Sequence, residues 1–397
     1  MIKTSEEFLL SENSISEADA LPELLECKKE EILFIDIETT GFSPKTSDLY
    51  LIGVAYFQGR NPHVCQFFAE NASQEKDILT GFIDLAKNFK YVIHFNGNRF
   101  DIPFLQNKIE KYGMPDPFKV IKSFDVYKMI APYKNQLGLP DCKQKTIELY
   151  LGINREDKYD GGKLIQIYKD YAQSKDTELL HLLLLHNCED VKGMFELLPM
   201  MRYEAFFGLF KNMPDYSIKT DSEIDDSAYV QVLPVRARKV QANYYKDYEG
   251  NEKKEVYMKL KLPFKLPSSL SGNLDGCYFK LEGDEGTLRV PLYEAELKYF
   301  YSNHKDYYYL PKEDMAIHKS IATFVDKAYR EQAKPETCYT KKEGQYLLEW
   351  DLTFAPFFKT DYSDKRFFFD LNENMKKSRF AMSLYACHVI AHILDMS

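Results

Sequence analysis

Four carboxylates and a histidine occur in this chain in an order that could bind divalent metal ions. Asp36 and Glu38 lie in ILFIDIETTGF, Asp101 lies in YVIHFNGNRFDIPFL, and Asp190 follows His186 by four residues in HNCEDV. Two of these segments are strongly apolar and predict buried strands that lead into turns. Because burying an acid is costly unless a cation meets it, the pattern indicates two divalent ions and metal-dependent nuclease chemistry.

The spacing of Asp36 and Glu38 places both side chains on one face of a strand. Residues two apart in a strand lie about 6–7 Å apart on the same face, which suits two acids that share an ion. The alternative is an edge strand whose polar face lies in water. ILFIDI is apolar on both sides of the acids, and this favours the buried site.

The other candidates are less specific when each is taken alone. Asp101 follows the strand end HFNGN and opens a helix after the turn at Gly97, so it could equally be a helix cap. His186 and Asp190 lie one helical turn apart, roughly 6 Å along the axis, and such a pair is more often a solvated stripe. The ordered set Asp, Glu, Asp, Asp is far more specific than any single member.

The elements around these residues predict an α/β domain. Strands are expected at 32–38, 50–57, 63–69, 91–96 and 118–126, and helices at 73–89, 97–113, 125–133, 144–153, 162–173 and 177–207. This element order is typical of a ribonuclease-H-like mixed sheet flanked by helices: three strands, a helix, a strand, a helix, a strand and then helices.

The length of 397 residues predicts two domains. We expect an acidic and helical N-terminal segment at 1–30, the α/β domain at 31–210, a polar linker at 211–228 and an α+β domain of unknown role at 229–397. In the last domain, EDMAIHKSIATFVDKAYREQA (313–333) has the pattern of an amphipathic helix, and a final helix is expected at about 375–393.

Composition narrows the function classes. The net charge of −9 argues against a long basic surface for duplex binding. No apolar run approaches the roughly 18 residues of a membrane span, and the seven cysteines form no CxxC pair. The chain is therefore expected to be cytoplasmic, with reduced cysteines and no membrane partner. The sequence gives no indication of the oligomeric state.

The segments DIETTGF, HFNGNRFDIPFL and HNCEDV resemble the three exonuclease motifs of the DEDD superfamily, the proofreading-exonuclease group. Within it, residues of about 31–205 most resemble the YprB-type ribonuclease-H-like family. The resemblance implies that the four acids bind two divalent cations, Mg²⁺ or Mn²⁺, and that His186 is the general base. It also implies substrate contacts at Thr39, Asn96, Asn98 and Phe100.

One departure from the family pattern concerns the base. DEDD enzymes usually place a histidine five residues before the last aspartate, or a tyrosine four residues before it. Here Leu185 occupies the first position and His186 the second. The residue type is that of one subgroup and the spacing is that of the other.

The resemblance implies a hydrolase that shortens single-stranded DNA or RNA from the 3′ end by a two-metal mechanism. A neutral histidine, whose unperturbed pKa is near 6.5, would accept the proton of the attacking water. Two alternatives remain open. One is a structure-selective endonuclease of the same fold, and the other is a non-catalytic nucleic-acid-binding adaptor.

Three weaker patterns lie in the C-terminal half. His388 and His392 have the spacing of a metal pair but lack an HExxH glutamate, so an amphipathic helix face explains them better. The tyrosines at 307–309 could line a second pocket or belong to a core. The basic stretch 236–265 contains four tyrosines. It is either a platform that binds single-stranded nucleic acid or an alternating pattern that gives a strand one solvent-exposed and one buried face.

Overall fold

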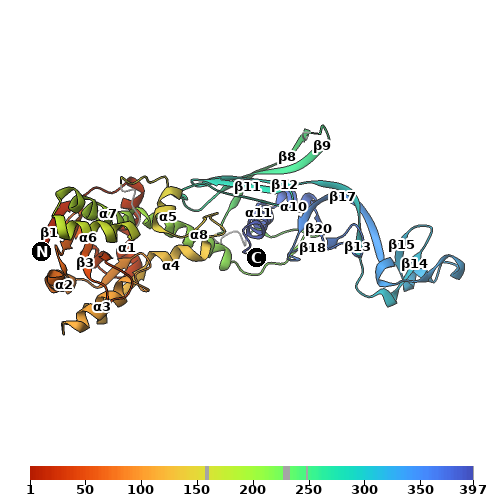
Figure 1. Cartoon of the computed structure of the whole chain (residues 1–397). Coiled ribbons are helices and arrows are strands. Elements are labelled where there is room, and N and C mark those ends of the chain that lie inside the picture. The colour runs from red at the N-terminus through yellow and green to blue at the C-terminus, as the bar shows by residue number, and fades with distance from the viewer. Residues whose placement is uncertain (157–160, 227–232, 247–248, 397) are drawn as a thin grey trace. The chain divides into compact units, whose positions relative to one another are not determined.

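The computed structural model describes residues 1–156, 161–226, 233–246 and 249–396. The chain forms two compact units, Met1–Glu204 and Ala205–Ser397, and Figure 1 labels their elements. No helix among the described residues is long and apolar enough to cross a membrane.

The first unit contains a six-stranded mixed sheet in the order β1-β4-β3-β2-β5-β6. Pairing is antiparallel from β1 to β2 and parallel from β2 to β6. The strands are β1 (Ile2–Glu7), β2 (Ile32–Thr39), β3 (Leu49–Gln58), β4 (Asn61–Phe68), β5 (Tyr91–His94) and β6 (Lys122–Asp125). The helices are α1 (Glu12–Leu25), α2 (Glu75–Ala86), α3 (Asp101–Lys111), α4 (Val126–Ile130), α5 (Gln144–Tyr150), α6 (Gly161–Ser174) and α7 (Thr177–Glu196), and α8 (Met201–Lys211) crosses the division between the units. The predicted ribonuclease-H-like architecture is confirmed.

The two faces of β2 are covered by different helices. Leu33, Ile35 and Ile37 share a buried cluster with residues of α2 and α3. Phe34 lies on the opposite face, where its ring stacks on Phe195 of α7 with 3.7 Å between centroids. Because side chains alternate along a strand, Asp36 and Glu38 lie on the same face as Phe34, the face covered by α7.

Two helical predictions in this unit were wrong in detail. Residues 2–7 form a strand that pairs with β4 along its whole length, so the acidic N-terminal segment contributes an edge strand to the sheet and only then becomes helical. The helix expected at 177–207 ends at Glu196, and α8 restarts at Met201. Pro199 lies between them, and proline lacks the N–H that would continue a helix.

The second unit consists mostly of antiparallel sheets. The largest has the order β10-β11-β12-β9-β8, and the next has the order β13-β17-β20-β19. Their strands are β8 (Arg236–Lys246), β9 (Glu252–Lys261), β10 (Leu270–Leu274), β11 (Cys277–Glu282), β12 (Glu285–Pro291), β13 (Tyr293–Phe300), β17 (Tyr339–Glu349), β19 (Phe357–Phe358) and β20 (Phe367–Asp370). In Figure 1, β8 and β9 run side by side as a long hairpin.

One face of the five-stranded sheet packs on the final helix, α11 (Arg379–Ile393), which follows α10 (Glu373–Lys377). The buried strand residues alternate with exposed ones, as in Val256, Met258 and Leu260 of β9. The backbone N–H of Ala237 donates to Ser383 Oγ at 2.9 Å, which ties β8 to the helix. The opposite face of this sheet lies open to solvent.

The prediction of an amphipathic helix at 313–333 was wrong. The segment instead contains β15 (Met315–His318), a single helical turn in α9 (Lys319–Ala322), and β16 (Glu331–Gln332). Both strands pair with β14 (Tyr307–Leu310). Asp314 has the left-handed φ of 50° at the hairpin turn and accepts a hydrogen bond from the Tyr309 hydroxyl at 2.6 Å. Cross-strand pairing and this turn therefore override the local helical pattern.

The segment expected to be a linker carries structure of its own. Within it, β7 (Ile218–Lys219) pairs with β18 (Phe354–Ala355), and the Thr220 backbone N–H donates to Ala355 O at 2.7 Å. The expected linker ends at 228, and its last two residues lie outside the described part of the chain. Residues 211–226 thus belong to the second unit.

Candidate active site

Strand β2 and helix α7 bring the candidate acids together. The two acids of β2 face the helix, and α7 presents His186, Asn187 and Asp190 to the sheet because these residues lie within about one turn of one another. His186 and Asn187 are buried, and the Asp190 side chain is 17% exposed. The site is therefore formed by side chains that project between strand β2 and helix α7.

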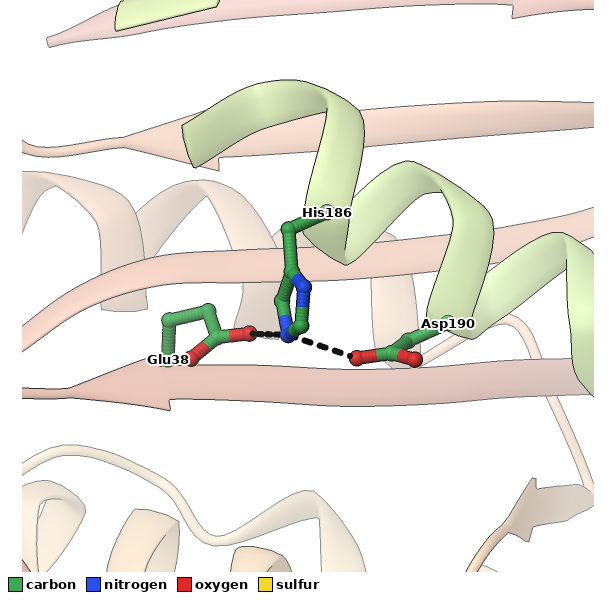
Figure 2. A group of neighbouring side chains, drawn as sticks. All are labelled: Glu38, His186 and Asp190. Carbon is green, nitrogen blue, oxygen red and sulfur yellow. Dashed lines mark ion pairs between the residues drawn. The ribbon is translucent and has the colours of Figure 1, made fainter. Parts of the chain in front are cut away.

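His186 lies between two acids, as Figure 2 shows. Its Nε2 is 3.4 Å from Glu38 Oε1 and 3.1 Å from Asp190 Oδ2. One potential metal ligand atom from each of these three residues lies within 4.8 Å of the others. Residues that are 152 positions apart in the sequence thus converge to the dimensions of a single ion site.

Asp36 is oriented by a polar chain that crosses the sheet. Asn187 Nδ2 donates to Asp36 Oδ2 at 2.8 Å, and Gln66 Nε2 donates to Asn187 Oδ1 at 2.9 Å. Gly53 pairs with Asp36 on one side and with Gln66 on the other. A Cβ atom at Gly53 would overlap the Asn187 amide, so glycine leaves the space in which this amide sits.

Asp101 joins the site from the start of α3. Its Oδ1 accepts a hydrogen bond from the Ile37 backbone N–H at 3.2 Å. The preceding residue, Phe100, is the N-cap of the helix and makes no side-chain capping bond. Asp101 is therefore turned toward strand β2 between Asp36 and Glu38, and it is not an ordinary helix cap.

Burial and mutual repulsion dominate the electrostatics of the acids. Burial raises the pKa of Asp36 well above its ordinary value, and the charges of Asp190, Glu38 and Asp101 raise it further. Burial also raises the pKa of Asp101 to about 7. Such shifts mean that ionising all four acids is unfavourable without added positive charge. A divalent cation with its preference for carboxylate oxygen fits this donor set.

Asp190 is the exception because a histidine and an arginine contact it. Burial alone would raise its pKa, but the hydrogen bond with His186 and the charge of Arg155 hold the pKa below its usual value. Arg155 Nη1 pairs with Asp190 Oδ1, and Arg155 Nη2 donates to Glu148 Oε1 at 2.6 Å. Glu148 is 1% exposed, so Arg155 links Asp190 to a buried anchor on α5.

A buried histidine shapes the turn that precedes Asp101. His94 Nδ1 accepts a hydrogen bond from the Gly97 backbone N–H at 2.9 Å, and its Nε2 lies 2.7 Å from Ser123 Oγ. Burial lowers the pKa of His94 to about 4. A Cβ atom at Gly97 would meet the His94 ring. A neutral imidazole and a glycine therefore hold the turn in place.

A pocket of about 610 Å³ opens beside Asp36 and Asp101. Its lining includes the predicted substrate residues Asn96 and Phe100. The exposed ring of Phe42 meets Phe100 edge to face at 6.2 Å and extends the apolar wall.

The other two predicted substrate residues are engaged in local bonds. Thr39 Oγ1 donates to Gly41 O at 2.8 Å. Asn98 Oδ1 accepts from Ser123 Oγ at 2.8 Å. Both residues stabilise loops next to the site, and neither lines the pocket.

Sequence reasoning missed Asn187, Arg155 and His94. Asn187 adjoins His186, and its partner Gly53 interrupts an otherwise apolar strand, a signal that could have indicated a close approach. Arg155 lies in the loop sequence GINRED, where nothing in the spacing relates it to Asp190. Its role depends on tertiary packing alone.

The histidine pair on α11 does not converge on one site. His388 Nε2 lies 3.6 Å from Glu349 Oε2, whereas His392 Nε2 lies 3.4 Å from Asp275 Oδ2. The His392 ring stacks on Trp350 with 4.1 Å between centroids. The two imidazoles thus contact different acids, as expected for a helix face that packs on its neighbours.

Comparison with solved structures gives remote similarities. The chain is 15% identical to a family B DNA polymerase from Pyrobaculum calidifontis, with a TM-score of 0.36 over 67% of this chain and 33% of that one. Exonuclease I of E. coli in complex with a dT13 oligonucleotide is 12% identical, with a TM-score of 0.30 over 58% of this chain and 54% of that chain. The zinc-bound exonuclease I–single-stranded DNA complex is 13% identical, with a TM-score of 0.28 over 59% and 55%.

These matches are too distant to carry an argument about function. The chain spans a third to just over half of the length of those proteins. A comparison with curated proteins gives no match.

A family model described as the RNase_H superfamily matches residues 33–202. The match includes the four acids and His186. It spans strands β2 to β6 and helices α2 to α7, whereas β1 and α1 precede it. The superfamily match and the acidic cluster support a nuclease. Residues 33–202 of this chain are therefore similar to the RNase H superfamily.

Proposed function

We propose that the chain is a metal-dependent 3′–5′ exonuclease of the DEDD type that hydrolyses single-stranded nucleic acid. The observation that carries the proposal is the convergence of Glu38, His186 and Asp190 within 4.8 Å, beside two further acids whose pKa values are raised by burial and repulsion. A scaffold without catalysis gains nothing from burying four acids together.

The four acids would hold two divalent cations, Mg²⁺ or Mn²⁺, because hard cations prefer oxygen ligands. Bound there, the ions would supply Lewis-acid activation of the phosphodiester and neutralise its charge. Arg155 keeps Asp190 ionised, and Asn187 fixes the rotamer of Asp36. The protein groups around the acids therefore prepare them to receive cations.

His186 would act as the general base. Its Nε2 already contacts two of the proposed metal ligands, so a water bound between these acids would lie within its reach. The ring nitrogen would accept the proton of this water as the water oxygen attacks phosphorus and the 3′-leaving oxygen departs.

The pocket beside Asp36 and Asp101 would hold the terminal nucleotide. Phe42 and Phe100 offer ring surfaces on which a base can stack, while Asn96 lies at the same wall. A pocket at the end of the acidic cluster suits a strand terminus, which is the reason to prefer an exonuclease over an endonuclease.

The test is cleavage of 5′-labelled and 3′-labelled single strands, DNA and RNA in parallel, in Mn²⁺ or in EDTA. We expect a Mn²⁺-dependent ladder from the 5′-labelled strand that shortens from the 3′ end, and its sugar preference identifies the substrate. Discrete internal cuts would indicate the structure-selective endonuclease instead. Absence of cleavage together with strand binding would indicate the non-catalytic adaptor.

A further inference from the structure

The open face of the five-stranded sheet in the second unit carries an unusual arrangement of cations. Residues Ala205–Ser397 contain 28 basic and 29 acidic residues, whereas Met1–Glu204 contains 24 basic and 32 acidic residues. The sheet face opposite α11 concentrates basic side chains in rows that run across the strands. It is therefore a local positive surface on an acidic chain.

The first row crosses four strands. Lys239 of β8 pairs with Lys259 of β9, Lys259 pairs with Thr287 of β12, and Thr287 pairs with Lys280 of β11. We call these four residues the basic row. Neighbouring strands lie about 4.8 Å apart, so the row extends over roughly 14 Å. Its three lysines are all exposed.

The pairing of Lys239 with Lys259 is unfavourable in the free protein. Like charges directly opposite each other on one sheet face repel. Within the described ranges, neither lysine has an acidic partner at ion-pair distance, whereas Lys280 lies 2.9 Å from Glu282 Oε2. An anion bound between the two lysines would remove the repulsion, and a phosphate is the anion that a nuclease substrate supplies.

The second row lies one pleat further along the same face. Tyr257 of β9 pairs with Arg289 of β12, and Arg289 pairs with Tyr278 of β11. The Arg289 guanidinium lies 5.9 Å from the centroid of the Tyr257 ring. We call these three residues the aromatic row. Because residues two apart on a strand are separated by about 6–7 Å, it runs parallel to the basic row at that distance.

A shallow hollow of about 470 Å³ joins the two rows. Tyr257, Lys259, Lys280 and Thr287 line it, together with Arg238, the residue at the β8 bulge. The bulge adds a cation next to Lys239 without interrupting the pairing on either side. Lys261 and two acids, Glu282 and Glu285, complete its charged lining. The hollow therefore brings four cations and the Tyr257 ring together, and its acids lie where β11 ends and β12 begins.

We propose that this open face grips single-stranded nucleic acid, with phosphates along the basic row and bases against the aromatic row. The identity of the ligand rests on the proposed nuclease function. A single strand has both features that the face matches, since its phosphates are accessible and its bases are free to stack. A duplex hides its bases, and an acidic polypeptide offers no ring surface for Tyr257 and Tyr278.

The test is equilibrium binding of a fluorescein-labelled dT12 or U12 strand, followed by anisotropy at several salt concentrations. The full chain is used with Asp36→Asn and EDTA, so that no cleavage occurs. Lys239→Glu with Lys259→Glu should weaken binding at least tenfold. The double variant should also flatten the dependence of log K on log salt by about 0.7 for each phosphate that the protein no longer neutralises.

Replacement of the aromatic row separates stacking from charge. Tyr257→Ala with Tyr278→Ala should weaken binding several-fold with little change in the salt dependence, and Tyr257→Phe with Tyr278→Phe should restore it. Lys305→Glu with Lys327→Glu is the matched control, because both lysines are exposed residues of this unit outside the sheet face. The control should bind within twofold of the parent, and thermal unfolding should show that every variant is folded.

The outcomes that overturn the inference are distinct from those that overturn the nuclease. The sheet face is not the grip if the Lys239/Lys259 variant binds like the control, or if the parent binds no strand at low salt. Competition by poly-L-glutamate as strong as that by dT12, with no effect of the tyrosine variants, would show a surface for acidic proteins. Cleavage is measured separately in Mn²⁺ with Asp36 intact, so a failed nuclease with a working grip remains visible.

Discussion

At the scale of single residues, the proposed active site contains repulsion between acids that a bound cation would relieve. Among the described residues, Asn187 is the hydrogen-bond donor to the Asp36 carboxylate, which faces three other acids. Asp190 has His186 and Arg155 as partners. The site is thus asymmetric, with one acid held ionised and another that resists ionisation.

Neutralising Asp36 should abolish activity while it increases thermal stability. Asp36→Asn keeps an oxygen that can accept from Asn187 and removes one of the repelling charges. We expect cleavage to be lost and the melting temperature in EDTA at pH 8 to rise. Activity and thermal unfolding measured on the same preparation check this, and wild-type cleavage by the variant would remove Asp36 from the catalytic site.

His186 is the residue whose role is least constrained by family spacing. His186→Ala removes the proposed base and leaves the four acids proposed to bind metal in place. We expect the cleavage rate in Mn²⁺ to fall by roughly 10²–10⁴-fold while Mn²⁺ still stabilises the protein against heat. A rate near that of the wild type would show that another group accepts the proton.

At the scale of elements, the contact between β3 and α7 requires a glycine. A Cβ atom at Gly53 would overlap the Asn187 amide, which Gln66 and Asp36 hold from two sides. Gly53→Ala should therefore destabilise the protein by about 1–3 kcal/mol through overpacking and also reduce cleavage. Gly208→Ala is the matched control, because a Cβ atom there meets nothing within 4 Å; in a helix it should be neutral or stabilising.

The junction of β17 with α11 contains a buried acid that is only partly satisfied. Glu349 Oε1 accepts from the Thr353 backbone N–H at 2.8 Å, and its Oε2 has no hydrogen-bond partner within the described part of the chain. Burial raises the pKa of Glu349 to about 7 and lowers that of the neighbouring His388 to about 4. The stability of this junction is therefore expected to depend on pH.

Replacing this acid should change stability in a pH-dependent way. Since the folded pKa of Glu349 is raised, its stabilising contribution is present below pH 4.5 and is lost as pH rises to about 7. Glu349→Gln should exceed the wild type by roughly 1–3 kcal/mol at pH 8, with a smaller difference at pH 5, in urea unfolding. Glu343→Gln, at an exposed position of the same strand, should give no such difference.

At the scale of the whole molecule, we propose that the acidic first unit cleaves the strand and the nearly neutral second unit binds it. The first unit carries the acidic cluster and most of the net negative charge, and the second carries the basic row. A catalytic unit that collects cations would itself repel a polyanion. A separate positive face would offset this repulsion by holding the strand.

Calorimetry tests this division directly. We expect two unfolding transitions, of which Mn²⁺ raises only the one that belongs to the first unit. A ligand at 100 times its dissociation constant adds about 2.7 kcal/mol to the stability of the unit that binds it. The shift should be absent in Asp36→Asn, and a shift of both transitions together would contradict independent units.

The α/β class and the placement of the two acids on β2 could be derived from the amino-acid order alone. Strand alternation fixes that Asp36 and Glu38 share a face, and one helical turn fixes that His186 and Asp190 do. Periodicity of this kind is a local property, so it can be derived without knowing what the element packs against.

The partners of these residues depend on how distant segments pack. Arg155 reaches Asp190, Asn187 meets Asp36, and Lys239 comes to lie opposite Lys259 only because the chain folds segments that are distant in sequence onto one another. The predicted helix at 313–333 became strands for the same reason, since a partner strand in β14 outcompeted the local pattern. Strand register and helix docking depend on contacts between distant segments, so the spacing of residues along the chain does not determine them.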